Sequence, residues 1–190
     1  VMLRFEVLTL FTEIFTSFLE ESLIKRAIEK QYLNVSLVNF RKNGHGKHLQ
    51  VDDTPYGGGP GMVLRIEPIA QTLKEQKEFH RSSGRETHTI LVTPQGRPFS
   101  QEKARELSKK KAVLTLICGR YEGFDERLRS LVDEEISGGD FICMGGEVIT
   151  MTMIETISRL VPDVLGNQES AIHESFTQPM LESVSYTHLR

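Results

Sequence analysis

The chain has 190 residues, and its 23 Lys and Arg against 26 Asp and Glu give a formal net charge of −3. A chain of this length buries roughly 70% of its unfolded surface on folding, so it needs no disulfide or metal to hold one sizeable domain. Its 38% apolar residues and 15 glycines exclude collagen, coiled coil and global disorder. The charge gives no general sign of nucleic-acid binding, which would need local patches.

The sequence predicts a cytoplasmic protein. No apolar run reaches the roughly 18 residues of a membrane span, and the start does not have the pattern of a signal peptide. Cys118 and Cys143 both lie in apolar stretches, so we expect buried, inert thiols in a reducing compartment.

Apolar periodicity changes several times along the chain, and each change marks a new element. The first half predicts a strand over 5–11, a helix capped by Thr12 with apolar residues over 14–23, a strand over 33–40, a polar loop over 41–62 and a helix over 66–80. The second half predicts a strand over 89–93, a helix capped by Ser100 through 110, a strand over 113–118, a short helix over 124–131, a short strand over 141–143 and a helix over 148–160. Alternating strands and helices predict an α/β fold with a mostly parallel sheet that helices cover on both faces.

Glycines gather in three loops that follow successive predicted strands. They are Gly96, then Gly119 and Gly123, then Gly138, Gly139, Gly145 and Gly146. A turn alone explains any one of these loops. Because ligands of open α/β sheets bind outside the carboxyl ends of the strands, three such loops in succession favour one shared ligand site.

The sequence excludes several kinds of ligand site. It has no phosphate-binding P-loop, no GxGxxG after the first strand, no GxSxG nucleophile elbow and no zinc-type spacing of Cys and His. The remaining expectation is an adenosine-like ligand that backbone atoms and apolar walls hold.

Five segments, in chain order, carry a family resemblance. They read DDTPYGGGPGM at 52–62, TPQGR at 93–97, CGRYEGFDER at 118–127, GDF with GGE at 139–147, and SR with PDVLG at 158–166. These segments resemble the bacterial tRNA (guanine-N1)-methyltransferases, the TrmD family of the SPOUT class. The resemblance implies an α/β SPOUT fold with a C-terminal trefoil knot, and methylation of the guanine just 3′ of the anticodon, at tRNA position 37.

The resemblance also implies a methyl donor and a partner. S-adenosylmethionine would lie in the knot, and the protein would be a homodimer whose active sites draw on both chains. The resemblance further implies a divalent metal ion, with Mg²⁺ as the first candidate, but no group of residues in the sequence indicates where it would bind. The donor contacts carried over are Thr93, Pro94, Gln95, Gly96, Gly119, Arg120, Tyr121, Glu122, Gly123, Gly138, Gly139, Phe141, Cys143, Gly145 and Gly146.

The reaction needs a base for the proton on guanine N1 and a cation for the charge that grows on the base. The resemblance implies that Glu174 of this chain is the base, with His173 as an alternative, and that Arg159 is the cation. Taken alone, Glu174 is typical of a solvated carboxylate and Arg159 of a snorkelling or paired arginine. Ser170 would contact the target base, and Asp52, Asp53 and Gly59 would seat the flipped-out guanine and its neighbour.

Two further features leave alternatives open. The basic stretch at 41–48 is typical of a solvated loop, but beside the 52–62 motif it is also a candidate for phosphate contacts. Tyr121 suits a stacking residue and a core residue equally well.

The expected division is a SPOUT catalytic domain over 1–166 and, over 167–190, a linker with the truncated start of a helical tRNA-binding domain. We expect such a chain to dimerise and bind S-adenosylmethionine but to methylate tRNA weakly or not at all. Two other functions remain open: a non-catalytic RNA-binding or dimerisation module, and a SPOUT methyltransferase that acts on ribosomal RNA.

Overall fold

A five-stranded sheet in the order β2-β1-β6-β5-β7 forms the centre of the computed structural model, which describes residues 2–166, 175 and 176. All four neighbouring strand pairs are parallel, which confirms the predicted α/β class with a mostly parallel sheet. A separate antiparallel pair, β3 and β4, forms a small hairpin. The strands are β1 (Leu3–Thr9), β2 (Leu33–Asn39), β3 (Asp52–Asp53), β4 (Val63–Leu64), β5 (Thr87–Pro98), β6 (Val113–Cys118) and β7 (Glu134–Ser137).

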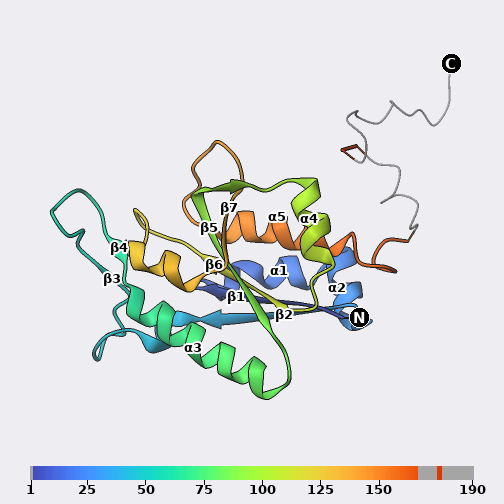
Figure 1. Cartoon of the computed structure of the whole chain (residues 1–190), viewed down its shortest axis with the longest axis horizontal. Coiled ribbons are helices and arrows are strands. Elements are labelled where there is room, and N and C mark those ends of the chain that lie inside the picture. Colours follow the sequence, from blue (N-terminus) through green and yellow to red (C-terminus); the bar gives the residue numbers. More distant parts are fainter. Residues whose placement is uncertain (1, 167–174, 177–190) are drawn as a thin grey trace.

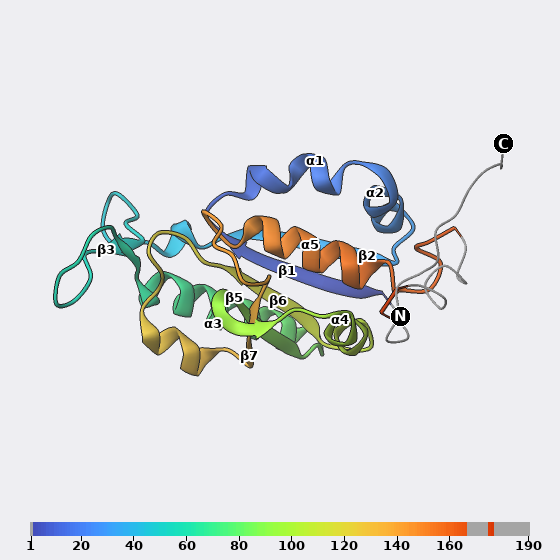
Figure 2. The same ribbon diagram turned by 90° about the horizontal axis from the view of Figure 1, so that it is seen from above.

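Helices cover both faces of the sheet, as Figures 1 and 2 show. The helices α1, α2 and α5 lie on one face and α3 lies on the other, while α4 packs against α5. Their bounds are α1 (Thr16–Leu19), α2 (Ser22–Glu29), α3 (Ile66–Ser82), α4 (Gln101–Ser108) and α5 (Glu147–Ser158), and the short 3-10 helices are η1 (Thr12–Phe15), η2 (Phe40–Asn43) and η3 (Glu126–Leu131).

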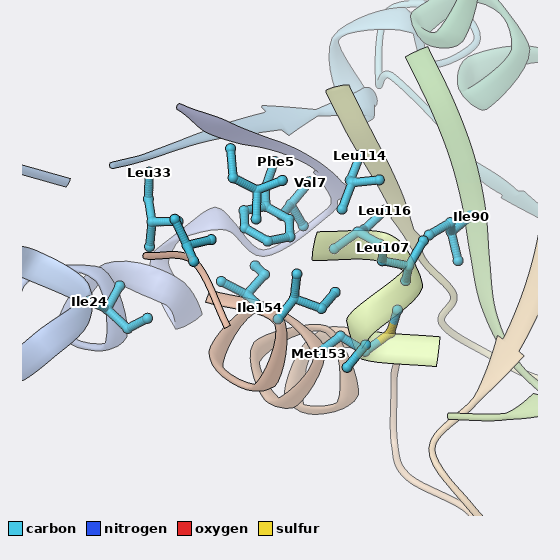
Figure 3. Packing of buried hydrophobic residues seen from close by; sticks show 14 of the residues in the cluster. Phe5, Val7, Ile24, Leu33, Ile90, Leu107, Leu114, Leu116, Met153 and Ile154 are labelled. Carbon is cyan, nitrogen blue, oxygen red and sulfur yellow. The ribbon is translucent and has the colours of Figure 1, made fainter. Parts of the chain in front are cut away.

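Two hydrophobic clusters fill the layers between sheet and helices. Leu114 and Leu116 of β6 face the α5 side, where they share a cluster with Met153 and Ile154 (Figure 3). Ile117 belongs to the opposite cluster, with residues of α3. Because β6 is buried on both faces, its sequence VLTLIC is almost continuously apolar, and this is why its bounds agree with the prediction.

The first predicted helix differs from the structure. The single helix expected after Thr12 is broken into η1, α1 and α2, and Thr12 is not its cap. Ser22, the first residue of α2, has a φ of 54°, in the left-handed region that interrupts a helix. The capping prediction for Ser100 is confirmed, since its Oγ accepts a hydrogen bond from the Lys103 amide at the start of α4.

The strand predicted over 141–143 is wrong. That segment has no strand, and Cys143 is exposed, not buried, while Cys118 is buried as predicted. The remaining strand of the five-stranded sheet is β7, which begins with Glu134 and Glu135 and therefore lacks the apolar pattern of a buried strand. These carboxylates are tolerated because His88 lies 2.7 Å from Glu134 and Arg129 lies 2.8 Å from Glu135. Within the described part of the chain, no helix is both long enough and apolar enough to cross a membrane.

Candidate functional site

A cavity of about 550 Å³ lies at the carboxyl ends of β6 and β7 and beside the middle of β5. This volume falls in the range of about 300–1,000 Å³ that small-molecule sites occupy. It is lined by Val63, Val92, Thr93, Pro94, Gln95, Gly119, Arg120, Tyr121, Glu122, Gly123, Phe124, Glu126, Ser137, Gly138, Phe141, Ile142, Cys143, Met144, Gly145, Gly146 and Ile149.

The three glycine-bearing loops therefore meet at one place. Of the fifteen residues named as donor contacts, all except Gly96 and Gly139 line the cavity. Gly96 lies against the neighbouring strand, where a Cβ would come 2.5 Å from the carbonyl carbon of Glu135 and the nitrogen of Ile136. Gly139 has a φ of 143°, which favours glycine. These two glycines shape the loops behind the cavity wall, and ligand contact by the other residues stays a prediction.

Arg120 is held in the wall by a buried carboxylate. Its Nε lies 2.9 Å from Oε2 of Glu147, whose side chain is only 1% exposed. The two atoms form an ion pair without the alignment of a hydrogen bond. The Phe11 ring stacks on the guanidinium, with its centroid 4.6 Å away, and Nη1 of Arg120 donates to the Met144 carbonyl at 3.4 Å.

The other oxygen of Glu147 is also occupied. The Thr9 hydroxyl donates to Oε1 at 2.8 Å and accepts a hydrogen bond from the Phe11 amide at 3.0 Å. The site thus reaches back to the end of β1. Gly145 leaves room for the arrangement, since a Cβ there would overlap both Arg120 and Glu147.

A second arginine supports the first of the three loops. Arg129 of η3 donates from Nη2 to Oε1 of Gln95, which lines the cavity. Its Nη1 lies 2.8 Å from Glu135 on β7, and its Nε lies 2.6 Å from Glu126. One guanidinium therefore joins β5, β7 and η3 beside the cavity.

The hairpin that carries the 52–62 motif is attached to the cavity wall by its backbone. The Glu122 amide donates to the Met62 carbonyl, the Leu64 amide to the Gly123 carbonyl and the Asp125 amide to the Leu64 carbonyl, at 3.0, 2.9 and 3.0 Å. Asp53 pairs with Arg65 at 3.2 Å. Gly59 is exposed, and the loop between β3 and β4 projects away from the rest of the fold (Figure 1). Asp52, Asp53 and Gly59 do not line the cavity.

Arg159, the predicted catalytic cation, does not line this cavity. Arg159 follows the last residue of α5, whereas the cavity meets the first turn of that helix at Gly145, Gly146 and Ile149. A helix of this length extends about 18 Å, which separates Arg159 from the cavity. Ser170, His173 and Glu174 lie outside the described residues.

Two residues with open or implied roles can be placed. Tyr121 lines the cavity, is 45% exposed and has a φ of 61°, so it is not a core tyrosine. Burial raises the pKa of the Cys118 thiol, which lies 3.2 Å from the Thr150 hydroxyl, so this thiol stays protonated and is not a nucleophile.

Within the described residues, no group of three or more His, Cys, Asp and Glu is placed to hold a metal.

Sequence reasoning assigned no role to Glu147. The available signal was a carboxylate directly after Gly145 and Gly146 at the start of an otherwise apolar helix, where burial requires a partner. The exposed Ile142 and Met144, which also line the cavity, were equally missed.

Comparisons with known proteins all identify relatives in one family. Residues 3–190 match the family model described as tRNA (Guanine-1)-methyltransferase TrmD. A tRNA (guanine-N(1)-)-methyltransferase of Syntrophotalea carbinolica is 45% identical over 183 residues, 96% of this chain and 72% of that protein. Its counterpart in Staphylococcus haemolyticus is 48% identical over 189 residues, 99% of this chain and 75% of that protein. The crystal structure of tRNA (m1G37) methyltransferase from Aquifex aeolicus aligns with a TM-score of 0.76 and 40% identity, over 88% of this chain and 73% of that one.

Proposed function

Because the chain belongs to the tRNA (guanine-1)-methyltransferase TrmD family, we propose that it transfers a methyl group from S-adenosylmethionine to N1 of the guanine 3′ of the anticodon in tRNA. The observation that carries this proposal is the cavity of about 550 Å³, where the three loops predicted from sequence converge. A tRNA substrate also favours a cytoplasmic location.

The residues around the cavity suit the proposed donor. Apolar side chains such as Val92, Phe141 and Ile149 offer walls for an adenosine, while the glycines at 119 and 123 leave backbone groups open to close approach. When bound, S-adenosylmethionine supplies an electrophilic methyl group on a sulfonium. Fixing the guanine in line with that methyl group can supply much of the acceleration.

The chain's own residues would supply the acid-base chemistry. Glu174, with His173 as the alternative, would remove the proton from guanine N1, and the Arg159 guanidinium would face the negative charge that grows toward the carbonyl oxygen. Ser170 would contact the base. The hairpin with Asp52, Asp53 and Gly59 would seat the flipped-out guanine beside the cavity, because its backbone is already bonded to the cavity wall.

Each active site would draw on two chains. Arg159 lies at the opposite end of α5 from the cavity of its own chain, so a partner must bring the two together. A segment of exposed apolar side chains offers an interface: Phe141, Ile142, Met144 and Val148 are 54, 81, 91 and 60% exposed. We therefore propose a homodimer.

The finer architecture is also part of the proposal. Residues 1–166 would form the catalytic unit, with the family's trefoil knot toward its C-terminal side, and residues 167–190 would lead toward a tRNA-binding domain. In support, β5 leaves its pairing with β7 after Val92 and resumes it at Arg97. Gly96 and Gly146 lie at the close backbone approaches that such a knot needs. Mg²⁺ remains a proposed helper ion with no assigned residues.

Two measurements test the function. Calorimetry should show S-adenosylmethionine binding, and methyl transfer should occur to tRNA transcripts with guanine, but not adenine, at position 37. Glu174→Gln should lower the transfer rate about 10²- to 10⁴-fold, with donor binding retained; His173→Asn is the matched variant for the alternative base. Transfer to ribosomal RNA, or tRNA binding without uptake of the donor, would contradict the proposal.

A further inference from the structure

Among the ion pairs described above, the one that Glu147 forms is the one in which a buried carboxylate contacts a cation of the cavity wall. This side chain is 1% exposed and lies against Arg120, which lines the cavity. The Thr9 hydroxyl accepts a hydrogen bond from the Phe11 amide, so its single proton is free to point at Glu147 Oε1. Both carboxylate oxygens thus face a donor or a cation.

Without Glu147, Arg120 would lose the carboxylate that pairs with it, and the wall would become more positive toward the ligand, although Glu122 and Glu126 also line the cavity. The Arg120 guanidinium cannot turn away easily, since the Phe11 ring and the Met144 carbonyl hold it at 4.6 and 3.4 Å. S-adenosylmethionine carries a sulfonium charge that its product, S-adenosylhomocysteine, does not have. A free guanidinium in the cavity wall would repel the sulfonium of the donor, whereas the product has no charge at its sulfur.

We propose that Glu147 is a positioning residue that neutralises Arg120 and so lets the cavity accept the cationic methyl donor in preference to the neutral product. This inference rests on the proposed function, because it takes the cavity to be the donor site. Thr9 orients the carboxylate, and Gly145 leaves space for the pair. The pair acts through charge and does not touch the reacting methyl group.

The test compares the dissociation constants of S-adenosylmethionine and S-adenosylhomocysteine by calorimetry on the full chain. Glu147→Gln keeps the shape and the hydrogen bond from Thr9 but removes the charge. For a charge about 10 Å from the sulfur at an effective dielectric constant of about 20, the ratio of the two constants should shift roughly tenfold against the donor. The double variant Glu147→Gln with Arg120→Met removes both charges, and its ratio should return to within about threefold of the parent value.

Arg120→Met alone leaves the carboxylate uncompensated, and the ratio should then move in favour of the donor. This single variant also decides the matter if Glu147→Gln does not fold. A purely structural role would weaken both ligands together and leave their ratio unchanged, and that result would overturn the inference while the proposed function stands. If the parent chain bound neither ligand, the proposed function itself would fail.

Discussion

At the scale of single residues, the glycines of the site have two different physical roles. Gly119 and Gly123 line the cavity, and a Cβ at either position would meet no protein atom closer than 3.6 Å, so the missing side chain leaves the wall open. Gly96 does not line it; it allows β5 to pass the backbone of Glu135 and Ile136. From sequence alone the two roles look alike, because both produce a glycine just after an apolar strand.

Gly96→Ala tests the structural role. Its Cβ would press on the backbone of the neighbouring strand, which cannot rotate away as a side chain can. We expect a loss of about 1–3 kcal/mol in the free energy of unfolding, measured by urea denaturation. Gly166→Ala is the control, since a Cβ there meets nothing within 4 Å and its φ is not left-handed. Equal stability of the two variants would contradict the assigned role.

At the scale of elements, one carboxylate joins η2 to α3. Glu75 of α3 accepts hydrogen bonds from Gln71 at 3.0 Å and Asn43 at 3.2 Å, and it pairs with Lys42 at 3.0 Å. These interactions, with that from Gln71 the largest, lower the pKa of Glu75 from 4.5 to about 2. Lys42, part of the basic stretch left open above, is therefore engaged within the fold.

The pH dependence follows from the direction of this shift. Because the pKa is lower in the folded state, the carboxylate stabilises the fold above pH 4.5, and this contribution is lost as the pH falls toward about 2. Glu75→Gln should be less stable than the parent at pH 7, and the difference should vanish over that acid range. Urea midpoints measured against pH would show it, with Glu78→Gln on the same helix as the control. A constant difference at every pH would contradict the assignment.

The same scale shows what patterns along the chain can and cannot reveal. The strand β6 was predictable because both its faces are buried, and the start of α4 because Ser100 supplies a capping oxygen. The strand β7 was not, since it begins with two carboxylates, Glu134 and Glu135, whose partners His88 and Arg129 lie 46 and 6 positions away. The apolar segment 141–143 misled for the opposite reason: its side chains are exposed, beside the cavity.

The site divides in the same way. The cavity-lining loops were predictable because their glycines and the family motifs are local in sequence. The link from Thr9 to Glu147 joins residues 138 positions apart, so no local pattern could indicate it. The remoteness of Arg159 from the cavity depends on the direction of α5, which only the fold provides.

At the scale of the whole molecule, the exposed apolar segment near α5 predicts association. Val148 is 60% exposed and, unlike Ile142, does not line the cavity. Val148→Asp should convert the proposed dimer to a monomer in sedimentation experiments, because a charge would be buried at the interface. Donor binding should remain, whereas methyl transfer should be lost. Phe79→Asp, at a 58% exposed site on α3, is the control; a dimer that survives Val148→Asp would place the interface elsewhere.

Because Arg159 lies at the far end of α5 from the cavity, two variants that are each inactive should complement one another when they are mixed. Arg159→Ala removes the guanidinium and leaves its own cavity intact, whereas Cys143→Trp fills the cavity from an exposed wall residue and leaves Arg159 in place. Each variant alone should be inactive. Once subunits exchange in an equal mixture, half of the dimers are hybrids with one intact centre, so about a quarter of the parent activity should reappear. If the mixture showed no methyl transfer, Arg159 would act in the active site of its own chain.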